Sequence, residues 1–410
     1  MRIVRSRLRT AAVVYALTTS VYATVSWERL GSPSRDNHFS YLADSILHGR
    51  LHLEGAPPHR NDWAKYQDRW YVSFPPFPTF LMLPGVAAFG LGFLDRLLVV
   101  LLSGLGPALS FLVLRALVDR GNSSRSERDD LMLTGLLSFG TVYFFCAVQG
   151  SVWYVAHVVA LPLFAGYLLA SLDARRPVLA GALLGCAFLT RTPALFAFPF
   201  FLLEARRDPD RRAAIRKVLL FALPLAAVGA LTMWMNHARF DDPFEFGHRY
   251  LQVRWTGRIE KWGLFNYHFL SKNLSAAFTL LPWLSREAPF VKISNHGLSL
   301  LVTTPVFAWL LWPAARPGLH RTLWITTACV AIPSLFYQNT GWVQFGYRFS
   351  NDYSLLLVML LATGARPLGR AFKAACIVAL AVNLFGAITF DRMPRFYDGD
   401  MTARNVFQPD

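Results

Sequence analysis

Charged residues are scarce in this sequence. Only 16% of its 410 residues are Asp, Glu, Lys or Arg, and 54% are hydrophobic. Because soluble domains are about one-quarter charged, this composition excludes an ordinary soluble protein. Apolar runs of about 17–25 residues, the length that crosses a bilayer, recur along the chain. We therefore predict an all-α polytopic membrane protein with about 11 transmembrane helices.

Cysteine is also scarce, and no group of cysteines or acids has the spacing of a metal site. All four cysteines lie in apolar segments, where they are small buried hydrophobes: Cys146, Cys186, Cys329 and Cys376. The pairs Asp129-Asp130 and Asp241-Asp242 resemble metal ligands only superficially, since Asp-Asp-Pro is a common turn. We expect no cofactor, and a divalent metal is an alternative that the pattern does not favour.

Acidic residues are outnumbered by basic ones, which gives a net charge of +16. The positive charge lies in short connections such as residues 204–217, as in cytoplasmic loops that face anionic lipid, so no nucleic-acid partner is expected. Four arginines in the first nine residues place the N-terminus in the cytoplasm. If successive crossings alternate strictly in direction, the basic segments 115–128 and 173–176 lie outside. This conflicts with the rule that positively charged loops face the cytoplasm.

The apolar runs predict the positions of the crossings: to residue 25, then 79–91, 94–117, 131–149, 152–171, 178–203, 218–234, 298–312, 323–336, 353–365 and 371–390. Segment 178–203 is interrupted by Arg191-Thr192-Pro193, so a hairpin is the alternative to a single crossing there.

The crossings and the polar stretches between them predict the organisation of the chain. It divides into a transmembrane module (1–236, with a first outer loop at 28–74), a second outer loop (237–297), C-terminal helices (298–390) and a tail (391–410). Both loops are expected on the same outer face.

The first outer loop opens with a polar motif at residues 35–50, RDNHFSYLADSILHGR. In a helix, Asp36, Ser40 and Asp44 share one face, and the apolar residues recur at spacings that suit an interfacial helix. A carboxylate in a partly dry cleft with cations nearby is suited to act as a general base. Asp36 is therefore the candidate catalytic residue, and a helix N-cap is its alternative role.

Further cations are candidates for holding an anionic group. Arg60 and Lys65 follow Asp36 in the same loop. Arg191 lies near the middle of an apolar segment, where an arginine is costly enough to indicate function, unless it occupies the turn of a short hairpin. Arg348 lies four residues before Asp352 in a connection expected on the outer face, so the two side chains pair or face one cleft.

Several motifs together resemble the GT-C glycosyltransferases. The closest likeness is to the protein O-mannosyltransferase and aminoarabinose-transferase branch, glycosyltransferase family 39 and its bacterial relatives. The motifs are the acidic motif directly after the first helix, Pro75-Pro76, and segments 185–193 (GCAFLTRTP), 236–247 (NHARFDDPFEFG) and 346–349 (GYRF). Asn37 departs from the family, because it replaces the second acid of the usual Asp-Glu pair.

The resemblance implies a GT-C-like enzyme in the bacterial plasma (inner) membrane. Such an enzyme transfers a hexosyl or pentosyl group from a polyprenyl-phosphate donor to a glycan, lipid or protein acceptor at the outer face, with inversion. In that interpretation Asp36 is the general base, and Arg60, Lys65, Arg191 and Arg348 contact the donor phosphate or sugar.

Two other classes compete with the enzyme. A transporter or flippase of lipid-linked saccharides needs polar groups along a path through the bilayer, whereas the polar residues here gather at one face. A catalytically silent scaffold is the third class, which the departure at Asn37 keeps open.

Overall fold

The structure is a computed structural model that describes residues 2–59 and 61–398. It is mostly helical, and its described residues form two compact units, each assembled from separate stretches of sequence. Unit 1 takes residues up to 25, 103–148 and those from 265 onward, and unit 2 takes residues 26–102 and 149–264.

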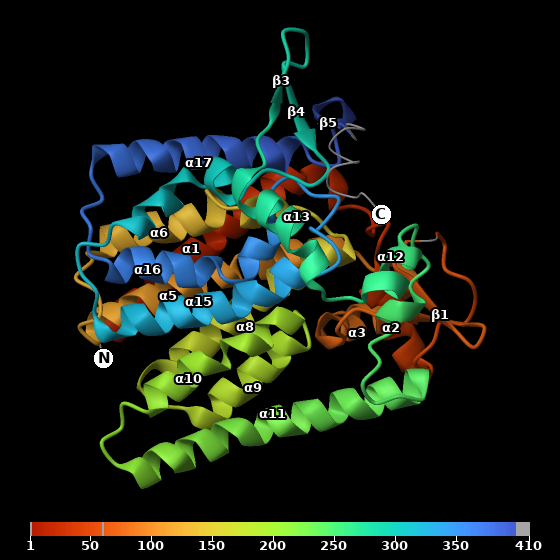
Figure 1. The fold of residues 1–410 in the computed structure, drawn as a ribbon, viewed down its shortest axis with the longest axis horizontal. Coiled ribbons are helices and arrows are strands. Elements are labelled where there is room, and N and C mark those ends of the chain that lie inside the picture. Colours follow the sequence, from red (N-terminus) through yellow and green to blue (C-terminus); the bar gives the residue numbers. More distant parts are fainter. Residues whose placement is uncertain (1, 60, 399–410) are drawn as a thin grey trace. The chain divides into compact units, whose positions relative to one another are not determined.

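Unit 1 is a helical assembly with a small sheet (Figure 1). Its central helix α16 (Ser354–Thr363) is buried along its whole length, as its uniformly apolar sequence requires. The short strand β4 (Val291–Ser294) pairs antiparallel with β3 and parallel with β5. The other elements are α1 (Arg2–Ser26), α5 (Leu105–Asp119), α6 (Glu127–Phe139), α7 (Tyr143–Ala147), α13 (Leu270–Leu274), α14 (Leu300–Thr303), α15 (Gly318–Phe336), α17 (Arg370–Thr389), β3 (Trp283–Leu284) and β5 (Tyr397–Asp398).

Side-chain bonds within unit 1 show which helix ends lie together. Arg7 near the start of α1 donates to Asp119 at the end of α5, and the Thr10 hydroxyl donates to Glu127 at the start of α6, at 3.0 Å. If α1 crosses the membrane, the chain has therefore returned to the same side by residue 119. The basic segment 115–128 lies at the same end as the N-terminus, which removes the conflict with the positive-inside pattern there.

Unit 2 combines a small hairpin with short and long helices. Strand β1 (Trp63–Tyr66) pairs antiparallel with β2 (Arg69–Val72), and Gln67 and Asp68 between them both have positive φ, as a type I′ turn requires. The helices are α2 (His38–Leu47), α3 (Phe77–Phe89), α4 (Asp95–Ser103), α8 (Val152–Ser171), α9 (Pro177–Phe188), α10 (Phe198–Ala205), α11 (Arg211–Phe240) and α12 (Thr256–Trp262).

The crossing predicted at 79–91 coincides with a short apolar helix that is not among the long spans. The helix there, α3, has 13 residues, too few to span a bilayer of about 30 Å, and it packs along α2. Because Arg7 and Asp119 are bonded, the chain must cross back once after α1. The stretch Asp95–Asp119 is long enough to be that crossing.

The single crossing predicted at 178–203 is wrong, and the hairpin alternative is correct. Helix α9 ends at Phe188, and α10 returns so that the Glu204 carboxylate accepts a hydrogen bond from the backbone N–H of Asp173, at 3.0 Å. The basic segments 173–176 and 204–207 consequently lie at one end of unit 2. Apolarity predicted that this stretch lies in the membrane but not that it reverses.

Among the residues that the structure describes, four helical stretches are long and apolar enough to cross a membrane: Asp95–Asp119, Val152–Ala174, Arg211–Phe240 and Arg370–Thr389. The second contains α8, whose bounds match the predicted crossing at 152–171. Only 17% of the most apolar window of α11 is buried inside the protein, which leaves an apolar surface for lipid. These features fit an integral membrane protein.

Candidate active site

Asp36 lies in the turn that precedes α2 and does not cap that helix. Helix α2 begins at His38, so the N-cap position belongs to Asn37, which makes no side-chain cap bond. The Asp36 carboxylate instead accepts a hydrogen bond from the Asn61 amide at 3.2 Å and lies 3.5 Å from His59 Nε2. Its side chain is 15% exposed. The N-cap alternative is thus excluded, and the carboxylate is oriented by two polar neighbours.

Backbone bonds hold this turn on both sides. The carbonyl of Asp36 accepts from the N–H of Val152 at the start of α8, at 3.0 Å. His59 Nε2 lies 3.0 Å from the carbonyl oxygen of Arg35. The turn is therefore tied to a long buried helix as well as to the loop that supplies Asn61, which fixes where the carboxylate lies.

An aromatic cluster lies next to the carboxylate. His38 is fully buried and stacks on Trp63, with ring centroids 3.8 Å apart, while Phe74 meets it edge-on at 5.3 Å. Burial lowers the pKa of His38 to about 4, against a smaller raising effect of the Asn61 carbonyl. His38 is therefore neutral at physiological pH, and its Nε2–H donates to that carbonyl at 2.9 Å. Its ring therefore packs against Trp63 and holds the Asn61 carbonyl, and it contributes no charge to the site.

A pocket of about 340 Å³, part of it open to solvent, lies beside Phe74 within unit 2. Its wall includes the loop of residues 73–76, the end of α9, Thr192 and the C-terminal part of α11. Arg239 of α11 lines it and is 5% exposed, donating to the Val72 carbonyl at 3.0 Å and to the Asn236 amide oxygen at 2.7 Å. Arg239 lies in the segment 236–247 that resembles the family, but the sequence did not predict its place in this wall, because it lies at the end of a helix whose lipid-facing residues dominate the pattern.

Arg191 lies at the turn of the α9–α10 hairpin and is half-buried. Its neighbours Leu189 and Thr192 both line the pocket. The carbonyl of Leu189 accepts from the N–H of Phe77 at 2.8 Å, so the turn is fixed against the start of α3. Arg191 is therefore in a hairpin turn, the alternative to an arginine in the middle of a crossing, and it is next to the pocket.

The remaining predicted cations lie in different surroundings. Lys65 is 40% exposed and pairs with Asp68 across the β-turn at 3.0 Å. Arg60 lies outside the described residues. Arg348 belongs to unit 1, where it is buried and donates to the carbonyls of Gly341 and Val343. Ser40, expected to share a face with Asp36, is buried in α2, with its hydroxyl 3.6 Å from the sulfur of Met82.

Asn61 and the aromatic cluster are the parts of this site that the sequence did not identify. Asn61 approaches Asp36 from 25 residues away, and the start of α8 approaches from more than 100 residues away. Gly150-Ser151 marks a break in the helical pattern just before α8. This local signal locates the start of the helix but not its contact with Asp36.

No protein-family profile matches the chain, and no curated protein matches it in sequence. Solved structures do resemble it. The oligosaccharyltransferase of Archaeoglobus fulgidus in the apo form matches with a TM-score of 0.52 at 15% identity, over 95% of this chain and 56% of that one. The same organism's oligosaccharyltransferase AglB, in complex with an inhibitory peptide and a dolichol-phosphate, matches with a TM-score of 0.51 at 14% identity, over 95% and 56%.

ArnT from Cupriavidus metallidurans bound to undecaprenyl phosphate has a TM-score of 0.49 at 15% identity, over 88% of this chain and 62% of that one. The chain thus spans little more than half the length of the oligosaccharyltransferase. At these identities the likeness concerns the fold. The protein has the fold of the GT-C glycosyltransferases, as the motifs of its sequence predicted, and it is an integral membrane protein.

Proposed function

We propose that the protein is a membrane glycosyltransferase that moves a sugar from a polyprenyl-phosphate donor to an acceptor at the outer face of the membrane. The observation that carries the proposal is the Asp36 carboxylate: it caps no helix, is partly exposed, and is held by Asn61 and His59 beside an aromatic wall. A positioned carboxylate of this kind suits removal of a proton from a hydroxyl.

The proposed reaction is a single displacement. The Asp36 carboxylate takes the proton of an acceptor hydroxyl while that oxygen attacks the anomeric carbon of the donor sugar. The bond between the anomeric carbon and the phosphate oxygen breaks, and the polyprenyl phosphate leaves with the electron pair. One attack from the opposite side inverts the anomeric centre.

Cations are needed where negative charge develops on the leaving phosphate. Arg191 is the first candidate, because it lies in the turn whose neighbouring residues line the pocket beside Phe74. Arg60, Lys65 and Arg348 are proposed for the same role on sequence grounds. That AglB was solved with a dolichol-phosphate supports a lipid phosphate as the carrier here.

The proposed setting is the plasma (inner) membrane of a bacterium, with several crossings and the Asp36 turn facing outward. The acceptor is a glycan, lipid or protein that presents a hydroxyl on that side. The location rests on the arginine-rich start of the chain, which favours a cytoplasmic N-terminus.

The test is a transfer assay with the purified protein in proteoliposomes. Polyprenyl phosphate carrying a radiolabelled sugar is added with an extract of membrane acceptors. We expect label to appear in an acceptor fraction together with an equal amount of free polyprenyl phosphate. Movement of the intact labelled lipid between leaflets, with no bond broken, would instead identify a flippase.

A further inference from the structure

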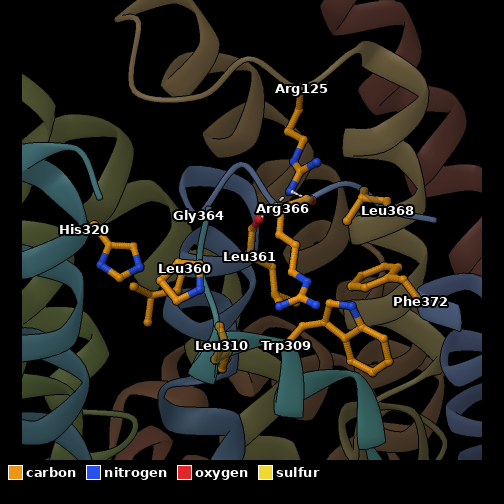
Figure 2. Close-up of a pocket in the computed structure, with 11 residues that line it drawn as sticks. Arg125, Trp309, Leu310, His320, Leu360, Leu361, Gly364, Arg366, Leu368 and Phe372 are labelled. Atoms are coloured by element: carbon orange, nitrogen blue, oxygen red, sulfur yellow. Dashed lines mark hydrogen bonds between the residues drawn. The ribbon is translucent and has the colours of Figure 1, made fainter. Parts of the chain in front are cut away.

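A second pocket lies in unit 1, at the end where α16 stops and α17 starts (Figure 2). Its empty space is about 270 Å³, a volume that includes space open to solvent. Arg125 and Arg366 line it together with Trp309, Leu310, Leu368 and Phe372. In Figure 2 the guanidinium of Arg125 points at the turn of residues 361–366, and the side chain of Arg366 extends toward Trp309 and Phe372.

Neither arginine has an acidic partner among the described residues. Arg125 is only 8% exposed, and its Nη2 donates to the carbonyls of Leu361 and Arg366, at 2.9 and 2.7 Å, while its Nε has no hydrogen-bond partner. The Arg366 guanidinium donates to the Trp312 carbonyl at 3.0 Å. Within the described part of the chain, neither forms an ion pair with a carboxylate.

The two acids that raise the pKa of Arg125, Asp129 and Asp130, already have other partners. Asp130 pairs with Arg115 at 2.6 Å, and Asp129 closes the capping box of α6 with Ser126. Burial lowers the pKa of Arg125, and these two acids offset that effect only in part. A buried guanidinium without a counter-charge is costly, so the pocket favours an anion.

Apart from His320, the rest of the pocket wall is apolar. Phe372 is 1% exposed and meets Trp309 edge to face, with ring centroids 5.7 Å apart. Phe372 lies at the start of the stretch Arg370–Thr389, which is apolar enough to span a bilayer and largely unburied by protein. Trp312, three residues after Trp309, is 62% exposed, as aromatic residues at a bilayer interface are.

We propose that this pocket binds the phosphodiester headgroup of an anionic membrane lipid, such as phosphatidylglycerol. The phosphate lies against Arg125 and Arg366, and the first carbons of the acyl chains lie against Trp309 and Phe372. Guanidinium groups match phosphate oxygens well in charge and geometry. The site takes no part in the proposed reaction, because none of its residues serves a step of the transfer.

The test uses native mass spectrometry of the purified full-length protein with two lipids that share acyl chains, phosphatidylglycerol and phosphatidylcholine. We expect retention of phosphatidylglycerol in preference to phosphatidylcholine. Arg366→Gln should weaken that retention by about fivefold, the usual effect of one cation at an anionic lipid surface. Arg125 is not the first choice for substitution, since it also caps the C-terminus of α16 and its loss can prevent folding.

The matched control is Arg370→Gln, which removes an exposed cation at the same end that does not line the pocket. Retention in this variant should equal that of the unmodified protein. Equal losses in the two variants would show a diffuse surface charge effect and overturn the proposal.

A separate experiment with inorganic phosphate distinguishes the source of the anion. If phosphate alone raised the thermal midpoint as much as phosphatidylglycerol does, the site would be for a soluble anion and the lipid assignment would be wrong.

Discussion

At the scale of single residues, the orientation of Asp36 depends on Asn61. The Asn61 amide donates to the carboxylate, whereas its backbone carbonyl serves His38 separately. Asn61→Ala therefore removes the first contact and keeps the second. We expect kcat to fall about 10- to 100-fold with little change in KM, as for a reacting group that is slightly misplaced. Steady-state kinetics of transfer measure this.

Asn61→Gln keeps an amide at the position and should recover part of the lost rate. The thermal midpoint should stay unchanged in both variants, because the amide makes no other side-chain bond. An Asn61→Ala protein with normal kcat would show that this contact does not position the base.

His38 makes stability depend on pH. Its folded pKa of about 4 lies below the ordinary value of 6.5, so between these values the unfolded chain binds a proton that the folded chain does not. The stabilising contribution is complete above about pH 6.5 and is lost as the pH falls toward 4, by about 3 kcal/mol in all. Thermal unfolding across this range should show the loss, and His38→Gln should flatten it. An unchanged slope in His38→Gln would contradict this account.

At the scale of elements, the hairpin of α9 and α10 is the clearest departure from the sequence pattern. Residues 178–203 are apolar apart from the interruption at Arg191-Thr192-Pro193 and are long enough for one crossing, so composition alone does not distinguish a span from a short hairpin. The decisive contact, between Glu204 and Asp173, joins residues 31 apart and is invisible to periodicity. Helix α8, by contrast, is one uninterrupted apolar run, and its bounds were predicted correctly.

The hairpin predicts the labelling of single cysteines in a background without the four natural ones. Cysteines at Arg176, before α9, and at Arg206, after α10, are exposed positions at the same end of unit 2. Both should react with an impermeant thiol reagent only when it reaches the cytoplasmic side. Reaction of the two positions from opposite sides would restore the single crossing.

At the scale of the whole molecule, the sequence predicted the class of fold and singled out Asp36, but it predicted neither the turn in which Asp36 lies nor the discontinuous units. Hydrophobic length identifies membrane segments one at a time, and motifs identify local chemistry. Neither reports which distant segments pack together. The start of α8 against Asp36, and Arg239 against Val72, are contacts of that kind. This is why the candidate base was found from sequence and most of its surroundings were not.

The central claim is that Asp36 is the general base of a glycosyl transfer, and Asp36→Asn tests it most directly. Asparagine keeps the shape of the side chain and still accepts the bond from Asn61, but it takes up no proton. Because Asp36 caps no helix, the thermal midpoint should be unchanged. In the purified transfer assay the rate should fall by about 10²–10⁴, the usual contribution of a positioned base. A normal rate in Asp36→Asn would contradict the assignment.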